Sequence, residues 1–328
     1  MVFIGPKDLK SRSWQYFPST LCSQPARIHP MSAASSPATL ESLRPLEGIR
    51  AVNLSLNLPG PVAAARLLRM GAHVTQIVPP SGDPMEDYNP AFYRSLHAGQ
   101  EFLRLDLKAP EDRAQFNALL SSADLLLTAF RPAALDRLGL GWDALHARHP
   151  RLCQVALVGD TSGAEGENIP GHDLTYQAER GLVAPPAMPL TLVADMAGAE
   201  RMVTTALALL LARARSQQGS YAQVALTTAA EDMALPLYQK MTTPDGFLGG
   251  ASPFYNLYRA QDGWIALAAL EPHFQKRLLA ELHLENGKNL QAASRDAFAA
   301  LFAARSAADW QIWAAQRDLP LVAVRVAR

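Results

Sequence analysis

The chain has 328 residues, 49% of them hydrophobic, and its 30 basic residues balance 30 acidic ones. This length and apolar content suffice for one large folded unit or two ordinary ones. The balanced charge gives no overall positive surface for nucleic acid or an anionic membrane, and apolar runs are too short to span a bilayer, so we expect neither partner. The two cysteines lie far apart in unlike surroundings, which argues against a disulfide framework and against a metal site.

Residues 1–43 differ in composition from the rest of the chain, with frequent Ser and Pro and more basic than acidic side chains. Two interpretations stay open for this segment. It is either a disordered extension, with Met31 as an alternative start, or an organellar transit peptide. The cysteine usage favours a reducing compartment, so we predict a cytoplasmic location unless the extension is a transit peptide.

The folded part is expected to begin at residue 44 with an alternation of strands and helices. Residues 49–54 form an apolar run that ends at a Pro-Gly-Pro turn and reads as a strand. A helical pattern over 62–70 follows, with Gly71 in the place of a C-terminal cap, and then a second apolar run at 73–78. A strand, a helix and a strand joined by short connections predict parallel strands with a right-handed crossover.

The same alternation continues through residue 235, and we assign 44–235 to a large α/β domain with a parallel sheet. Further strands are expected at 102–107, 124–128, 152–158 and 221–225, and helices at 111–121 and 196–215. A loop rich in Gly, Pro and acidic residues spans 159–189. Loops of this kind, held by a regular scaffold, often carry the chemistry.

Residues 236–328 read as a smaller α+β domain. An Asp262-Gly263 turn between the apolar runs 251–258 and 263–268 predicts a hairpin. Helical patterns follow at 274–284, 295–303 and 307–317, and a final strand is expected at 320–324. These elements suit a small sheet covered by helices.

Three segments hold candidate catalytic side chains, and each also has a structural interpretation. His172 stands beside Asp173 in the polar loop, where it would be a proton carrier or a helix cap. Asp195 precedes the long apolar helix and reads first as its N-cap. Glu271 precedes Pro272, and this pair also marks a helix start.

Together with the N-terminal half, these segments resemble the family III CoA-transferase superfamily of the CaiB/BaiF type, and among its branches most of all the α-methylacyl-CoA racemases. The resemblance runs from about residue 45 to 324. The motifs that carry it occur in the expected order at 45–52 (PLEGIRAV), 59–61 (PGP), 71–74 (GAHV), 81–84 (SGDP), 105–108 (LDLK), 123–125 (ADL), 130–132 (FRP) and 137–140 (RLGL).

The resemblance implies a Rossmann-like large domain with a smaller domain, assembled as an interlocked homodimer. It implies an acyl-CoA substrate, with coenzyme A as part of that substrate and no permanently bound cofactor. By position, His172 and Asp195 would flank the α-carbon of the acyl group and exchange its proton, with Glu271 in support. The remaining matched positions would bind the substrate: Arg131 and Arg104 at the CoA phosphates, Asp173 and Tyr176 around the thioester.

Three functions stay open on this basis. The first is epimerisation of the α-carbon of a 2-methylacyl-CoA by proton transfer between histidine and aspartate. The second is CoA transfer between carboxylic acids, with Asp195 as a nucleophile that passes through an anhydride to an aspartyl-CoA thioester. The third is a degenerate relative that binds acyl-CoA weakly or needs a partner subunit. Basic residues that relatives use for phosphate are missing at 78–80 (VPP) and 97–102 (HAGQEF), and we expect that the C-terminal segment by which relatives return to the large domain is missing as well.

Overall fold

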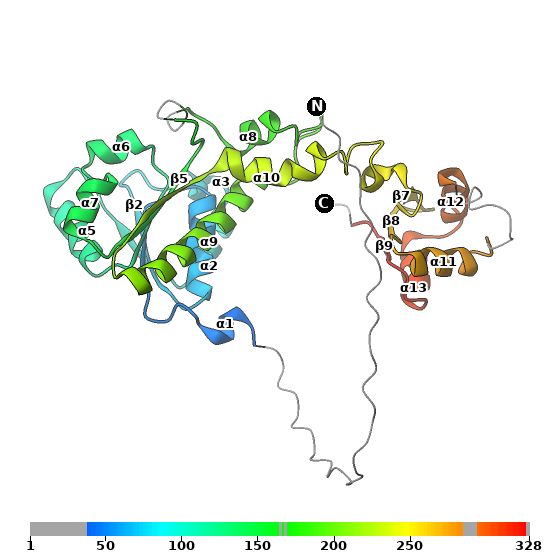
Figure 1. Cartoon of the computed structure of the whole chain (residues 1–328), viewed down its shortest axis with the longest axis horizontal. Coiled ribbons are helices and arrows are strands. Elements are labelled where there is room, and N and C mark those ends of the chain that lie inside the picture. Colours follow the sequence, from blue (N-terminus) through cyan, green and yellow to red (C-terminus); the bar gives the residue numbers. More distant parts are fainter. Residues whose placement is uncertain (1–37, 164–165, 167–168, 285–293, 326–328) are drawn as a thin grey trace, which may run out of the picture. The chain divides into compact units, whose positions relative to one another are not determined.

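The computed structural model describes residues 38–163, 166, 169–284 and 294–325. Of the segment 1–43, residues 1–37 lie outside the described residues, and the remainder holds one helical turn, α1 (Leu40–Leu43). A compact unit extends from Leu40 to Arg328. It contains two sheets, which are described separately below (Figure 1).

The larger sheet has six strands in the order β3-β2-β1-β4-β5-β6, and each pairs in parallel with its neighbours. This is the doubly wound order of Rossmann-like folds, so the predicted α/β class is confirmed. The strands are β1 (Arg50–Asn53), β2 (His73–Val78), β3 (Glu101–Arg104), β4 (Leu125–Thr128), β5 (Cys153–Val158) and β6 (Tyr221–Ala225).

Helices cover both faces of this sheet, as a parallel sheet requires. One core packs α2 (Pro59–Arg69) and α9 (Val193–Ser216) against the sheet, and the other packs α5 (Pro110–Ser121), α6 (Pro132–Arg137) and α7 (Trp142–Arg148) against it. Figure 1 shows the two groups on opposite sides. Successive strand residues alternate between these cores, with Ala51 and Leu125 in the first and Val52 and Leu126 in the second.

Four helices complete this part of the chain: α3 (Pro84–Tyr88), α4 (Pro90–His97), α8 (Asp173–Glu179) and α10 (Leu226–Tyr238). Proline occupies the first turn of α2, α3, α4, α5 and α6. Its fixed φ suits a helix start, and its missing N–H is not needed there. Of these helices, α2, α3, α5 and α6 follow strands β1 to β4, so their prolines fix where the loops at the carboxyl edge of the sheet end.

The smaller sheet is antiparallel, in the order β7 (Tyr255–Arg259), β8 (Trp264–Ala268), β9 (Leu321–Ala323). The predicted hairpin is confirmed, with the Ala260 amide donating to the Gly263 carbonyl oxygen at 2.9 Å. The strand predicted from residue 251 begins only at Tyr255, because Phe247–Ala251 forms a wide helical turn in which Gly250 has a φ of 107°. An aromatic core joins the sheet to α11 (Pro272–Glu281), α12 (Arg295–Phe302) and α13 (Ala307–Ala315).

Within the described ranges, none of the helices combines the length and apolar character that a membrane crossing needs. The same residues contain no group of three or more His, Cys, Asp or Glu side chains placed to hold a metal ion.

Candidate active site

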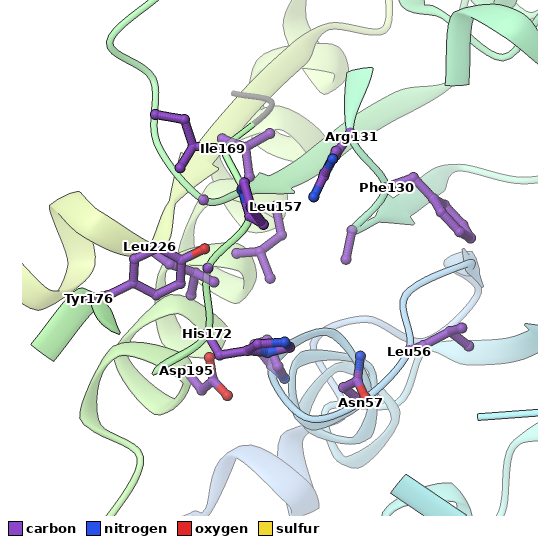
Figure 2. A pocket seen from close by; sticks show the side chains of 16 residues that line it. Leu56, Asn57, Phe130, Arg131, Leu157, Ile169, His172, Tyr176, Asp195 and Leu226 are labelled. Atoms are coloured by element: carbon purple, nitrogen blue, oxygen red, sulfur yellow. The ribbon is translucent and has the colours of Figure 1, made fainter. Parts of the chain in front are cut away.

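A cavity of about 220 Å³ lies at the carboxyl edge of the parallel sheet. It lies beside the loops that follow the neighbouring strands β1 and β4, which lead to helices on opposite faces of the sheet. Ligands of doubly wound sheets bind at this point. Figure 2 shows its side chains converging from these loops and from α8 and α9. The lining residues are Leu56, Asn57, Pro59, Ala129, Phe130, Arg131, Leu157, Val158, Gly159, Ile169, Pro170, Gly171, His172, Tyr176, Asp195 and Leu226.

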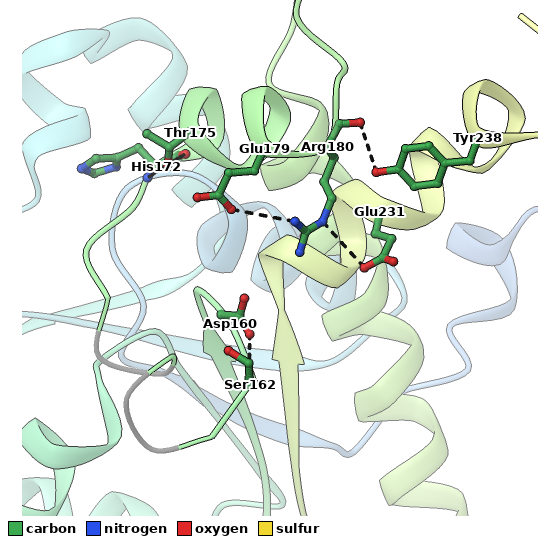
Figure 3. A network of polar contacts seen from close by, with 8 residues as sticks. All are labelled: Asp160, Ser162, His172, Thr175, Glu179, Arg180, Glu231 and Tyr238. Carbon is green, nitrogen blue, oxygen red and sulfur yellow. Dashed lines mark hydrogen bonds and ion pairs between the residues drawn. The ribbon is translucent and has the colours of Figure 1, made fainter.

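His172 is the residue immediately before α8, in extended backbone conformation. Its amide donates to Thr175 Oγ1 at 3.1 Å, and that hydroxyl donates to the His172 carbonyl oxygen at 2.8 Å. Thr175 thus fixes the backbone at the helix start, and the imidazole ring extends into the cavity (Figure 2). The far end of α8 is tied to α10, because Tyr238 donates to the Arg180 carbonyl oxygen at 3.1 Å (Figure 3).

Asp195 lies in the first turn of α9, two residues after the helix begins at Val193. The prediction that it caps the helix is therefore wrong, since Leu192 occupies the cap position. The helix begins earlier than the sequence predicted, because Val193 and Ala194 already have helical conformation. The carboxyl group instead lines the cavity, as does the side chain of His172 (Figure 2).

The ionisation of Asp195 is displaced far from that of an ordinary aspartate. Burial, and secondly the charge of Asp173, raise its pKa from 3.8 to about 7. A carboxyl group with this pKa exists in both protonation states near neutral pH. Asp195 can accordingly take up a proton or deliver one under the same conditions.

Asp173 is buried, with 4% of its surface exposed, and does not line the cavity. One carboxylate oxygen accepts the backbone N–H of Asp195 at 3.0 Å. The other accepts from Gln177 Nε2 at 2.5 Å, and the same amide group donates to the Thr191 carbonyl oxygen at 3.0 Å. These contacts join the first turn of α8 to the first turn of α9.

Tyr176 occupies the wall of the cavity, and two glycines make room for it. A Cβ atom on Gly159 or on Gly171 would lie 2.6 Å from the Tyr176 hydroxyl oxygen. Burial, followed by the charge of Asp195, raises the Tyr176 pKa, so the phenol keeps its proton at neutral pH. Arg131, which comes directly before the helix-opening Pro132, brings a positive charge to the same cavity.

Sequence reasoning missed Asn57, which lines the cavity between β1 and α2. Its φ of 63° lies in the left-handed region, and its backbone N–H donates to both carboxylate oxygens of Asp83, at 3.0 and 3.1 Å. Asparagine tolerates this conformation better than most residues. An asparagine shortly before Pro-Gly-Pro was the signal in the sequence, although Pro59–Pro61 forms the first turn of α2 and not the turn that was predicted.

Besides Asp173, two predicted site residues do not line this cavity. Arg104 donates to the carbonyl oxygens of Pro80 at 2.9 Å and Pro79 at 3.3 Å, so it braces the loop after β2. Glu271 precedes α11, which belongs with the smaller sheet, and there it marks the helix start that the sequence predicted.

A second cavity of about 190 Å³ lies at the same edge of the parallel sheet and shares Phe130 with the first. Its walls are mainly apolar, and Lys108 provides a positive charge. The lining residues are Leu54, Ile77, Pro79, Pro80, Leu105, Asp106, Leu107, Lys108, Phe130 and Leu138.

Comparison with known proteins decides the family. The model of CoA-transferase family III matches residues 46–328, which is most of the chain. The chain belongs to CoA-transferase family III. The predicted resemblance is thereby confirmed, and the protein is an enzyme of this family by relationship.

Relatives of this family III chain differ in their activities. Human α-methylacyl-CoA racemase is 31% identical over 288 residues, which cover 81% of this chain and 74% of the racemase. The acetyl-CoA:oxalate CoA-transferase of Acetobacter aceti is 27% identical over 255 residues, covering 71% and 66%. The solved structure of Rv3272 from Mycobacterium tuberculosis superimposes with a TM-score of 0.73 and 26% identity, covering 86% of this chain and 83% of that one.

Proposed function

We propose that this protein epimerises the α-carbon of a 2-methylacyl-CoA by proton transfer between His172 and Asp195. One observation carries the proposal. The two side chains line a single cavity, and the pKa of Asp195 is raised to about 7. Deprotonation next to a thioester carbonyl needs a base matched to neutral pH, and inversion needs an acid on the other face. The relationship to the racemase agrees with this assignment.

The reaction balances with these two groups alone. For one epimer, ionised Asp195 removes the α-proton, and the C–H electrons move into an enolate. Protonated His172 then delivers a proton to the opposite face of the α-carbon, which leaves the acid and the base exchanged. The other epimer reacts in the reverse sense, so both side chains must alternate between protonation states.

The developing enolate oxygen needs nearby donors or positive charge. Arg131 brings positive charge to the cavity, and Tyr176 brings a hydroxyl that stays protonated at neutral pH. Backbone amides in the first turns of α8 and α9 lie at the positive ends of those helices. We propose that these groups stabilise the enolate, while Glu271 remains a predicted supporting carboxylate.

We further propose that coenzyme A lies along the edge of the parallel sheet. The first cavity is large enough for a thioester with a small acyl portion but not for the whole cofactor. The adjoining apolar cavity offers a place for the adenine end, with Lys108 and Arg131 near the phosphates. Arg104 is engaged by backbone carbonyl groups, so its predicted contact with a phosphate would require it to leave Pro79 and Pro80.

CoA transfer is the second candidate function, since relatives include CoA-transferases. In that reaction the Asp195 carboxylate attacks the acyl-CoA carbonyl and expels the CoA thiolate, which leaves an acyl-aspartyl anhydride. The thiolate then attacks the aspartyl carbonyl of the anhydride, so that the donor acid leaves and an aspartyl thioester remains. The acceptor acid runs the same steps in reverse, which yields the new acyl-CoA and frees Asp195. The access of Asp195 to the cavity favours it. That mechanism gives His172 no obligatory task.

Substitution of His172 separates the two reactions. His172→Ala should abolish interconversion of the two epimers if the protein is an epimerase, and should spare CoA exchange between acids if it is a transferase. Asp195→Asn should lower either activity by about 10²–10⁴-fold. Unchanged turnover of Asp195→Asn in both assays would contradict both functions. Absence of acyl-CoA binding by folded wild-type protein would favour a degenerate relative.

We also propose that the protein works as a homodimer in the cytoplasm. Support for association comes from exposed apolar side chains on α9 and α10, among them Leu207, Leu211, Met233 and Leu235. The cytoplasmic assignment rests on the cysteine usage, and the described Cys153 is a free buried thiol. Sedimentation of the purified chain tests the first statement, and subcellular fractionation tests the second.

A further inference from the structure

The buried carboxylate of Asp173 contacts the backbone of Asp195, one member of the proposed proton-transfer pair. Asp173 is 4% exposed and lies outside the cavity lining, so it has no surface to offer to a substrate. Both of its oxygens are engaged, one by the Asp195 amide at 3.0 Å and the other by Gln177 Nε2 at 2.5 Å. Burying a carboxylate is costly unless its oxygens accept hydrogen bonds, and here they do.

The position of this carboxylate affects Asp195 in two ways. The N–H groups in the first turn of a helix lack partners within the helix, and Asp173 supplies one from another helix. It thereby fixes the backbone that carries the Asp195 side chain. It also places a second acidic group next to Asp195, and like charges at short range oppose each other's ionisation.

We propose that Asp173 is a positioning residue for the α-proton transfer. It anchors the first turn of α9 so that Asp195 faces the cavity, and it places a negative charge next to the Asp195 carboxyl group. The inference rests on the proposed function and replaces the substrate contact predicted for Asp173. Gln177 holds Asp173 in place, since its side-chain amide donates both to Asp173 and to the Thr191 carbonyl oxygen just before α9.

Other charged groups face Asp195 or its helix. On the cavity side these are His172, Tyr176 and Arg131. On the packed sides of α9 the nearby charges are paired: Arg66 of α2 contacts Glu200 at 2.9 Å, and Arg201 pairs with Asp232 of α10. Of these groups, Asp173 is the carboxylate bonded to the Asp195 backbone. The charge on Asp173 also contributes, after burial, to the raised pKa of Asp195.

Asp173→Asn is the informative variant, because an asparagine oxygen can still accept the Asp195 amide while the charge is gone. Glu179→Gln is a matched control that removes an exposed carboxylate from the same helix. The Asp195 carboxyl is titrated by ¹³C NMR in aspartate-labelled protein, with its resonance assigned by its absence in Asp195→Asn. We expect Asp173→Asn to lower the midpoint by about one pH unit. Glu179→Gln should leave it in place.

Kinetics with a 2-methylacyl-CoA give a second measurement. In Asp173→Asn the rate of α-proton exchange should begin to rise at a lower pH than in wild type, by the same shift as the Asp195 midpoint. Asp173→Ala, which also removes the anchor, should lower kcat by tenfold or more with a smaller change in KM. A folded Asp173→Asn protein whose Asp195 midpoint is unmoved would overturn the proposal, as would Asp173→Ala with wild-type kcat.

The NMR titration and the kinetic measurements together separate this proposal from the proposed function. If wild-type protein exchanges no α-proton of any 2-methylacyl-CoA, the epimerase function fails. The NMR titration still decides whether Asp173 governs the ionisation of Asp195, because it needs no substrate.

Discussion

Replacing Asp195 by asparagine should stabilise the folded protein while it removes activity. The pKa of this carboxyl group is about 7 in the folded protein, against an ordinary value of 3.8. Below about pH 3 the group is protonated in both the folded and the unfolded state, so its ionisation does not affect stability. As the pH rises toward 7, the unfolded chain ionises first, and the folded state loses about 1.36 kcal/mol per pH unit. Above pH 8 the loss is constant.

The full cost is about 4 kcal/mol above pH 8, from a pKa difference of about three units. Between pH 5 and pH 8.5 it grows by about 2.5 kcal/mol. Asparagine does not ionise and carries no such cost. The free energy of unfolding of Asp195→Asn minus that of wild type should therefore increase by about this amount over the same range.

Urea unfolding followed by circular dichroism at pH 5, 6, 7 and 8.5 measures the difference, with the slopes of the two proteins compared at each pH. Glu179→Gln serves as the control, since its carboxylate is exposed and its difference from wild type should not vary with pH. A difference for Asp195→Asn that stays constant from pH 5 to 8.5 would refute the reasoning. It would mean that Asp195 is ionised in the folded protein throughout.

Substitutions at three further positions probe the cavity. Arg131→Ala should raise the dissociation constant for CoA by tenfold or more at low salt, and calorimetry that finds no change would place the phosphates elsewhere. Gly171→Ala should destabilise the protein by about 1–3 kcal/mol, because the added Cβ would lie 2.6 Å from the Tyr176 hydroxyl oxygen; an unchanged melting temperature would contradict this contact. Asp83→Ala should weaken CoA binding by releasing the Asn57 turn, whereas Asp83→Asn should retain part of it. Equal affinities for both Asp83 variants and wild type would count against that support.

Much of the parallel sheet was predictable because its strands are nearly continuous apolar runs. All residues of β4 and β5 are buried, and a run of this kind between turn signals has few other interpretations. β3 is less regular, since it lies at the edge and exposes 42% of Phe102. The strand at 251–254 was wrongly predicted, because a left-handed glycine redirects the chain before the apolar pattern can pair.

The candidate site was predictable only in part. The motifs singled out His172 and Asp195, and both line the cavity. Sequence spacing could not show that Asp173 bonds the Asp195 amide across 22 positions, because this contact depends on how two helices meet. The same limit explains Asn57, whose place in the cavity depends on Asp83 from another loop.

The most direct test of the proposed reaction uses both epimers of a 2-methylacyl-CoA separately in deuterated water. Wild-type protein should convert each epimer to the same mixture and incorporate one deuterium at the α-carbon, because the proposed mechanism places His172 and Asp195 on opposite faces of that carbon. Recovery of either epimer unchanged and without deuterium, from protein that binds it, would contradict the account.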